Sequence, residues 1–301
     1  MENMGLNEFL IEHLNKQYGK TLAEEIVEGY KCQRYTTLRI NTLLTSKIEV
    51  LSVLDSLDIK YEEVPLFNDA LVILNKNSKE MLELEICKSG KIYLQSLSSQ
   101  LPALLLYPKE KCDILDMCAS PGSKTTYLAQ LVNNNAFITA CEIDKIRMER
   151  LKFNVNKLGA TCVNFICTDS RKLDDYFRFD QILLDAPCSG SGTLSVHDKS
   201  MMKFSKALVY NSSKLQTELL KKALTILKPG QEMIYSTCSI LDIENENVVN
   251  NVLKSMKCSV IPFSEDVRNL LPLLPTTIEG SLCIKPNQYF EGFYVIKIKK
   301  A

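Results

Sequence analysis

Two cysteines stand in settings that suit a reactive thiol. Cys188 lies in the segment DAPCSGSG (185–192) and Cys238 lies in STCS (236–239), and each segment follows a short apolar run. A free cysteine inside a strand usually packs as a small hydrophobic residue, whereas a thiol in a polar, accessible setting can react. If the two runs are neighbouring strands of one sheet, both thiols face one cleft. The placement therefore indicates thiol chemistry at a shared strand edge.

A loop of small residues follows an apolar run further upstream, in DMCASPGSKT (116–125). Small residues between a strand and a helix allow a ligand to approach the backbone. The loop lacks the G-x-G-x-x-G pattern of dinucleotide-binding proteins. It also lacks the Walker A glycine, because Ser123 stands directly before Lys124. Dehydrogenase and ATPase functions are therefore disfavoured.

Acidic residues follow the next two apolar runs. Glu142 is 20 residues beyond Gly122 and is followed by Asp144, and Asp169 comes after the third run. An acid at such a distance from the glycine loop can bind the hydroxyl groups of a ribose. A further acid at the same edge can accept a hydrogen bond from an adenine amino group. Together these residues predict a site for an adenosine-containing cofactor without a pyrophosphate.

The elements that must position these residues alternate along the second part of the chain. Strands are predicted at 113–117, 137–141, 162–167, 181–184 and 233–235, with helices at 125–132, 145–158 and 213–227. This rhythm is typical of a doubly wound, mostly parallel α/β sheet, whose ligands bind at the carboxyl ends of the strands. The first part is predicted to be a small α+β unit, with helices at 6–18 and 48–57 and strands at 38–41 and 71–74.

Length, composition and net charge limit the number of domains and the class of protein that the chain can form. The chain has 301 residues, 46% of them hydrophobic, which favours about two globular domains, and we place the boundary at 1–108 and 109–301. Its net charge is zero, so a global basic footprint for nucleic acid is absent. The sequence has no apolar run long enough to predict a membrane span, and its first residues lack the apolar core of a secretory signal. Eleven cysteines without a C-x-x-C pair, beside two histidines, favour a reducing cytoplasm without disulfides or a metal site.

Four segments resemble the RsmB/NSUN family of S-adenosylmethionine-dependent RNA 5-methylcytosine methyltransferases. They are DMCASPGSKTT (116–126), CEID (141–144), DAPCSGSG (185–192) and YSTCS (235–239). The segments LRINTL (38–43), LQSLSSQLPALLLYP (94–108) and EGFYVIKIKK (291–300) are also similar to family elements. The resemblance implies a Rossmann-like class I methyltransferase fold with a final antiparallel strand at 292–299, preceded by a domain that positions RNA.

The same resemblance implies a role for each site residue. Cys238 would be the nucleophile that adds to C6 of cytosine, Cys188 would assist product release, and Asp185 would hold the cytosine near N3 and its amine. Lys124 would belong to both the catalytic and the cofactor-binding groups. The implied cofactor-binding residues are Cys118, Ala119, Ser120, Pro121, Gly122, Ser123, Lys124, Glu142, Arg147, Asp169 and Asp185. No metal is implied.

Three functions are weighed against one another. The first is an RNA cytosine-C5 methyltransferase acting on ribosomal or transfer RNA, with a single-stranded or flipped-out target base and no obligatory protein partner. The second is a non-catalytic RNA-binding or assembly factor of the same fold. The third is a DNA cytosine-C5 methyltransferase, which would use Cys188 as nucleophile. In the first part, Arg34, Tyr35 and Arg39 would contact RNA, or Arg39 and Asn41 would instead tie the two parts together.

Overall fold

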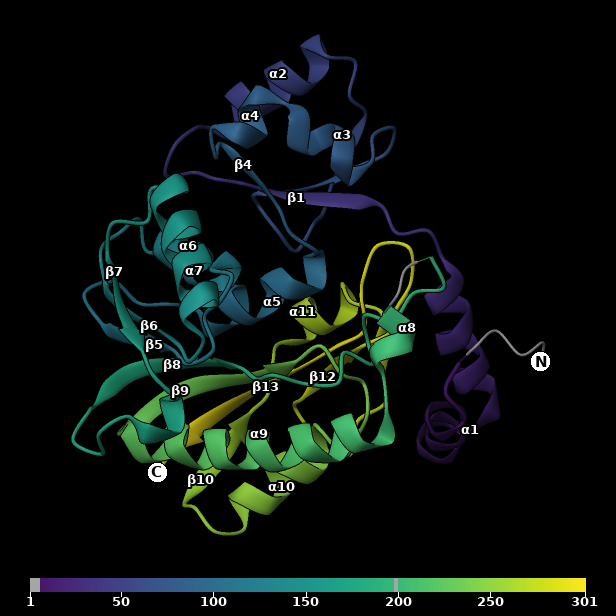
Figure 1. Ribbon diagram of the computed structural model, residues 1–301, viewed down its shortest axis with the longest axis vertical. Coiled ribbons are helices and arrows are strands. Elements are labelled where there is room, and N and C mark those ends of the chain that lie inside the picture. Colours follow the sequence, from purple (N-terminus) through teal and green to yellow (C-terminus); the bar gives the residue numbers. More distant parts are fainter. Residues whose placement is uncertain (1–5, 198–199) are drawn as a thin grey trace. The chain divides into compact units, whose positions relative to one another are not determined.

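The computed structural model describes residues 6–197 and 200–301, which form two compact units (Figure 1). The first comprises 35–173 and 179–183 and is called the central unit here, because of its place in the sequence. The second comprises the described residues of 1–34, 174–178 and 184–301 and is called the terminal unit. The expected boundary at residue 108 stays a prediction, because these units group the chain by contact and not by sequence order.

The central unit begins with a small antiparallel sheet. Its strands are β1 (Thr36–Ile40), β2 (Tyr61–Glu63), β3 (Ala70–Ile73) and β4 (Ile92–Leu94), in the order β2-β3-β1-β4. Helices α2 (Lys47–Ser56), α3 (Ser78–Glu83) and α4 (Glu85–Lys88) lie beside it (Figure 1). The predicted helix at 48–57 and the strands at 38–41 and 71–74 are therefore confirmed to within one or two residues.

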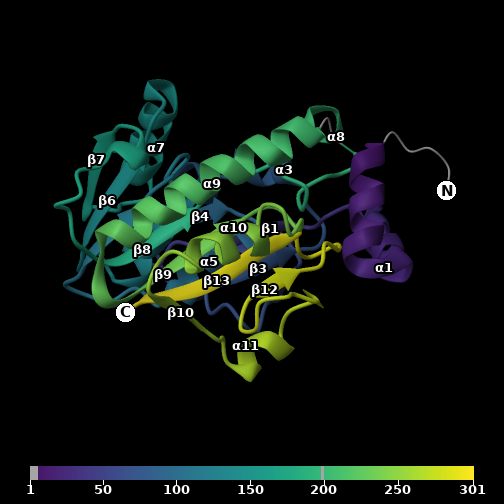
Figure 2. The same ribbon diagram turned by 90° about the horizontal axis from the view of Figure 1, so that it is seen from below.

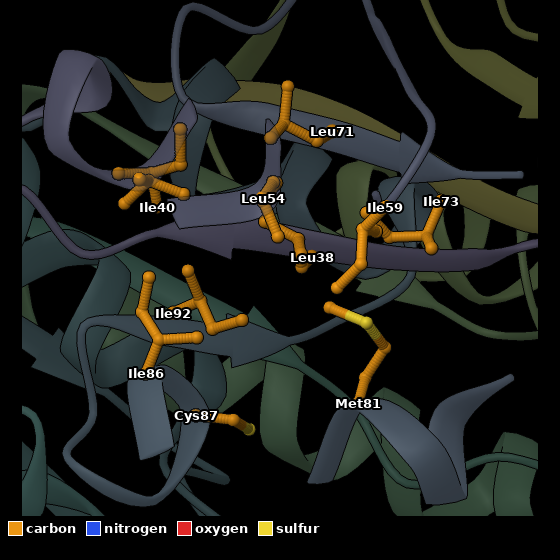
Figure 3. Packing of buried hydrophobic residues seen from close by; sticks show 11 residues of the cluster. Leu38, Ile40, Leu54, Ile59, Leu71, Ile73, Met81, Ile86, Cys87 and Ile92 are labelled. Carbon is orange, nitrogen blue, oxygen red and sulfur yellow. The ribbon is translucent and has the colours of Figure 1, made fainter. Parts of the chain in front are cut away.

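A hydrophobic core holds these helices to the small sheet. Figure 3 shows Leu54 of α2 and Met81 of α3 among side chains of β1 and β3, including Leu38 and Ile73. Burying one leucine side chain stabilises a fold by about 1.5–3 kcal/mol. Cys87 of α4 is part of the same core, and burial raises the pKa of its thiol, so this cysteine acts as a packing residue.

The central unit continues into a parallel sheet. Strands β5 (Asp113–Asp116), β6 (Phe137–Glu142), β7 (Val163–Cys167) and β8 (Phe179–Asp185) run in the order β7-β6-β5-β8, and every pair in it is parallel. Helix α6 (Ser123–Leu131) follows β5, and α7 (Lys145–Lys157) follows β6. Gly159 has a φ of 69° and forms a left-handed cap directly after α7. The last two residues of β8 belong to the terminal unit.

Arg39 and Asn41 join the small sheet to the parallel one inside the central unit. Arg39 is 1% exposed, and its guanidinium donates to Thr126 (3.0 Å), to Gln95 (3.2 Å) and to Gln130. Asn41 donates to the carbonyl oxygen of Leu158 at 3.0 Å. The expected RNA contact of Arg39 is wrong, because its side chain is enclosed, and the alternative tying role is confirmed. Helix α5 (Leu97–Leu106) packs on α6.

The terminal unit has an antiparallel sheet. Strand β9 (Leu227–Thr237) pairs with β13 (Phe293–Lys300), which confirms the antiparallel last strand. The other edge of β13 pairs with β12 (Leu282–Ile284) and β10 (Cys258–Ile261), and β12 pairs with β11 (Leu273–Leu274). Figure 2 shows β13 beside β12. The helices of this unit are α8 (Ser200–Lys203), α9 (Lys206–Ile226), α10 (Glu246–Leu253) and α11 (Glu265–Asn269).

Helix α1 (Glu8–Lys31) also belongs to the terminal unit. The hydroxyl group of Tyr18 donates to the carbonyl of Ile240 at 2.5 Å, and that of Tyr30 donates to the carbonyl of Ser191 at 2.8 Å. Helix α1 therefore contacts the segment that carries Cys188 and the residue that directly follows the segment of Cys238. Within the described residues, none of the helices combines the length and the apolar character that a membrane crossing requires.

Candidate active site

The loop after β5 makes a tight turn before α6. The N–H group of Gly122 donates to the carbonyl of Ala119 at 2.7 Å, and the N–H group of Ala119 donates to the carbonyl of Cys141 at 2.9 Å. Gly122 has a φ of 104°, and a Cβ atom there would lie 3.0 Å from Leu151. Only glycine adopts this conformation without strain, so the residue type fixes the turn.

The chain after β6 holds the same loop from one side. The hydroxyl group of Ser120 donates to the backbone carbonyl of Arg147 at 3.0 Å, and the Arg147 guanidinium donates back to the Ser120 carbonyl at 3.3 Å. Asn154 donates to the carbonyl of Pro121 at 2.7 Å. The loop is therefore a fixed cradle of backbone groups.

Glu142 ends β6 as a buried carboxylate that is 3% exposed. One of its oxygens accepts from the N–H group of Asp144 at 3.0 Å, and the other lies 3.3 Å from the Arg147 guanidinium. Asp144 in turn caps α7 by accepting from the N–H group of Arg147 at 2.8 Å. Arg147 thus connects the acid at the end of β6 with the loop after β5.

Asp169 follows β7 and caps the short 3₁₀ helix Ser170–Lys172. Its carboxylate pairs with the Arg171 guanidinium at 2.6 Å, and this hydrogen bond lowers the pKa of Asp169. The hydroxyl group of Ser170 donates to the carbonyl of Met117, which ties this segment to the loop after β5. The structure therefore brings together the ends of three strands, as the sequence analysis expected.

Lys124 and Cys118 belong to the same part of the central unit. The ammonium group of Lys124, on the first turn of α6, donates to the hydroxyl group of Ser99 on α5 at 3.0 Å. Cys118 is half-buried in the loop itself. Cys141, in contrast, is fully buried inside β6, and burial raises the pKa of its thiol to about 12. Of these two thiols, only that of Cys118 is accessible to a ligand.

Cys188 and Cys238 lie together in the terminal unit, with their sulfur atoms 2.9 Å apart. We call these two residues the thiol pair. Both side chains are half-buried, so neither is sealed inside the core. The hydrogen bond between the thiols, burial and the charge of Glu244 together raise the pKa of Cys188. Cys188 is therefore a neutral thiol at neutral pH.

Backbone and side-chain contacts hold the two cysteine segments in register. The hydroxyl group of Ser236 donates to the Asp185 carboxylate at 2.8 Å, and the N–H group of Ala186 donates to the Ser236 carbonyl at 2.8 Å. Gly192 donates to the carbonyl of Cys238 at 2.9 Å. A Cβ atom on Gly192 would lie 2.0 Å from the carbonyl oxygen of Gly292, so glycine is required where these backbones meet.

Sequence reasoning missed the polar residues behind the thiol pair. Glu244 and Gln216 are both 0% exposed and bind the segment that carries Cys188. Their contacts join residues far apart in the sequence, so no local spacing of residues predicts these contacts. In the sequence, the run Glu244-Asn245-Glu246 directly precedes the apolar face of α10. Such a polar run is also typical of the solvated start of an ordinary helix, so it does not indicate a buried role.

Arg34, expected to contact RNA, donates to the backbone carbonyls of Thr193 and Leu194 at 3.1 and 2.9 Å.

The chain matches two protein-family models. One is described as the 16S rRNA methyltransferase RsmB/F family and covers residues 103–299. The other is the ferredoxin-like domain of RsmF/B-like methyltransferases and covers residues 6–79. The fold is accordingly the Rossmann-like fold of S-adenosylmethionine-dependent methyltransferases, with a ferredoxin-like α+β domain at the N-terminal end.

Individual relatives agree with these models. The chain is 31% identical to the ribosomal RNA small subunit methyltransferase F of Shewanella loihica, over 95% of this chain and 63% of that protein. It is 30% identical to the 28S rRNA (cytosine-C(5))-methyltransferase of Mus musculus, over 97% of this chain and 38% of that protein. A crystal structure of a methyltransferase homologue from Pyrococcus horikoshii superposes with a TM-score of 0.86, at 28% identity, over 99% of this chain and 96% of that one. The chain thus spans less than two thirds of these two curated relatives.

Proposed function

The chain belongs to the RsmB/F methyltransferase family, and we propose that it transfers a methyl group from S-adenosylmethionine to C5 of a cytosine in RNA. The thiol pair carries this proposal, because C5 methylation of cytosine requires a nucleophilic thiol and the structure holds two thiols 2.9 Å apart on polar segments. The names of the curated relatives favour ribosomal RNA over transfer RNA as the substrate.

The cradle after β5 fits the cofactor in chemical terms. The start of α6 at Gly122 has no side-chain cap, and a helix N-terminus favours a carboxylate such as that of a methionine moiety. We assign residues 118–124 to the methionine end of the cofactor, Glu142 to the ribose hydroxyl groups and Asp169 to the adenine amino group. Arg147 holds the Glu142 carboxylate in place. When bound, the cofactor supplies an electrophilic methyl group on its sulfonium.

Cys238 performs the first step in this proposal. The Cys238 thiol loses its proton as its sulfur adds to C6 of the cytosine, and the displaced electron pair moves through the ring to N3, which takes up a proton, while Asp185 holds the cytosine near N3 and its amine. C5 then becomes nucleophilic and would take the methyl group from the bound cofactor, whose S–CH3 bond breaks to leave a neutral thioether. The bond between Cys238 and C6 traps the RNA on the protein until it breaks.

Cys188 acts in release. After methyl transfer, C5 must lose its proton to a base, and the electron pair of that bond restores the ring double bond while the C6–S bond breaks. The Cys238 sulfur leaves as a thiolate. Cys188 is a neutral thiol beside that sulfur, so it donates a hydrogen bond to the departing charge. Loss of Cys188 therefore slows release without preventing attack.

Two substitutions test this assignment. The variant C238A is expected to lose methylation of an unmodified small-subunit rRNA transcript and all covalent capture of that RNA on a denaturing gel. C188A is expected to accumulate the captured RNA. C258A serves as a matched control, because Cys258 is also half-buried but lies on β10.

Other results would assign a different function. Capture that persists in C238A and disappears in C188A would make Cys188 the nucleophile, as in a DNA methyltransferase, and the same assay with DNA would then be productive. An unmodified chain that binds RNA but shows neither S-adenosylmethionine binding by calorimetry nor methyl transfer would be an RNA-binding factor of this fold.

A further inference from the structure

A short turn behind the thiol pair contacts both cysteine segments. It follows β9 and comprises residues 241–245, which we call the anchor turn. The N–H group of Glu244 donates to the carbonyl of Leu241 at 3.1 Å, and that of Asn245 donates to Asp242 at 3.2 Å. Glu244 and Asn245 are each 0% exposed, so two consecutive polar side chains are enclosed here. Such groups are stable in the interior only when they are hydrogen-bonded.

Glu244 binds the segment of Cys188. Its carboxylate accepts from the N–H group of Ser189 at 2.7 Å and from the hydroxyl group of the same residue at 2.5 Å, and it also has a side-chain hydrogen bond with Ser239, next to Cys238. Gln216 of α9 donates to the carbonyl of Pro187 at 2.9 Å. Cys188 is therefore fixed through both of its neighbours in the sequence, one of them by a charge-assisted pair of hydrogen bonds.

Asn245 binds the segment of Cys238. Its amide nitrogen donates to the carbonyl of Ser239 at 2.9 Å, and its oxygen accepts from the hydroxyl group of Thr237 at 2.5 Å. Cys238 lies between these two residues, so it is also fixed through both of its neighbours. The two halves of the thiol pair thus depend on adjacent residues of one turn.

We propose that Glu244 and Asn245 are positioning residues that divide the work, Glu244 holding Cys188 for product release and Asn245 holding Cys238 for attack. The inference rests on the proposed function of the thiol pair. Neither residue touches the cytosine in this account. Each acts mainly through the hydrogen bonds that fix both sequence neighbours or the following neighbour of one cysteine, and the bond from Glu244 to Ser239 is the one contact that crosses to the other segment.

If Glu244 and Asn245 act in different steps, substitutions of these two neighbouring residues should impair different steps of the reaction. E244A leaves two donors of Ser189 without an acceptor, and it is expected to slow RNA release about tenfold or more while covalent capture forms at nearly the normal rate. N245A is expected to slow capture by a similar factor without accumulation of the captured RNA. E244Q keeps one acceptor oxygen and is expected to fall between E244A and the unmodified chain.

A buried carboxylate two residues away supplies the control. Glu246 is 3% exposed but lies near Asp242 and the backbone of Thr277, away from the cysteine segments. E246Q is therefore expected to preserve both capture and release. If E244A and N245A lose capture and release together, with E246Q unaffected, the turn holds the fold as a whole and the division of work is wrong.

A measurement without RNA separates this inference from the proposed function. The titratable groups facing Cys188 are those of Cys238, Glu244 and Tyr235. Removal of the Glu244 charge in E244Q lowers the pKa of Cys188, so iodoacetamide should alkylate Cys188 faster at pH 8, as counted by mass spectrometry of its peptide. An alkylation rate that equals that of E246Q would overturn the placement of Glu244, whether or not the chain methylates RNA.

Discussion

The acids of the central unit and the thiols of the terminal unit are held by different kinds of contact. Asp144 and Asp169 pair with residues three and two positions further along the chain. The thiol pair depends on contacts between Ser189 and Glu244, which are 55 residues apart, and between Pro187 and Gln216, which are 29 apart. The contacts of these two acids are therefore local, whereas the thiol geometry depends on the packing of several segments.

The two units also differ in the charges that surround their buried or half-buried carboxylates. In the central unit the Asp169 carboxylate lies beside the Arg171 guanidinium, whose hydrogen bond lowers the pKa of Asp169. Glu244 of the terminal unit is enclosed without such a cation in contact among the described residues, and burial raises its pKa. An ionised Asp169 suits the hydrogen bond from an amino group that we propose for it. In the terminal unit, the Glu244 charge contributes to the raised pKa of Cys188, which keeps that thiol protonated.

The largest stability effect in the central unit is expected at Arg39. R39M removes hydrogen bonds to Gln95, Gln130 and Thr126, and leaves the buried Asp69 without its favourable charge. Loss of one partner from such a network costs about 3 kcal/mol in the free energy of unfolding, measured in urea. The alkylation rate of Cys188 should stay unchanged in folded protein. K47M, which removes an exposed ion pair with Glu63, serves as the control and should cost less than about 1 kcal/mol.

A smaller effect, on binding alone, is expected at Glu142. E142Q replaces the carboxylate that we assign to the ribose hydroxyl groups and should weaken S-adenosylmethionine binding about tenfold or more, as measured by calorimetry. E149Q is a matched change on α7, because Glu149 is exposed and pairs only with Lys152 among the contacts described. Equal affinities of E142Q and E149Q would remove Glu142 from the cofactor site.

The smallest effect is expected at Asp169. Its folded-state pKa is depressed by Arg171, so the stabilisation from this pair is present above the unfolded-state value near 3.8 and is lost as the pH falls through the folded-state value. R171A should therefore cost about 0.5 kcal/mol at pH 7, because the pair is partly exposed. The difference from the unmodified chain should shrink below about pH 4 in urea titrations. A difference that is constant with pH would show that Arg171 stabilises by packing.

Features set by local sequence could be predicted, whereas features set by long-range packing could not. The residues at the strand ends were found because a parallel sheet places the carboxyl ends of its strands at one edge, whatever the rest of the fold. The tie through Arg39 was left open, since an arginine in a strand gives no sign of whether its partner is a glutamine or a phosphate. Glu244 and Asn245 were missed because their partners are set by long-range packing and not by spacing.

The location of the covalent bond tests the central claim most directly. RNA captured by C188A would be digested with nuclease and protease, and the peptide that carries the residual cytidine would be identified by mass spectrometry. We predict one modified site, at Cys238, with a mass that corresponds to a methylated cytidine adduct. A cytidine attached to any other residue, or the absence of a stable adduct in C188A, would contradict it.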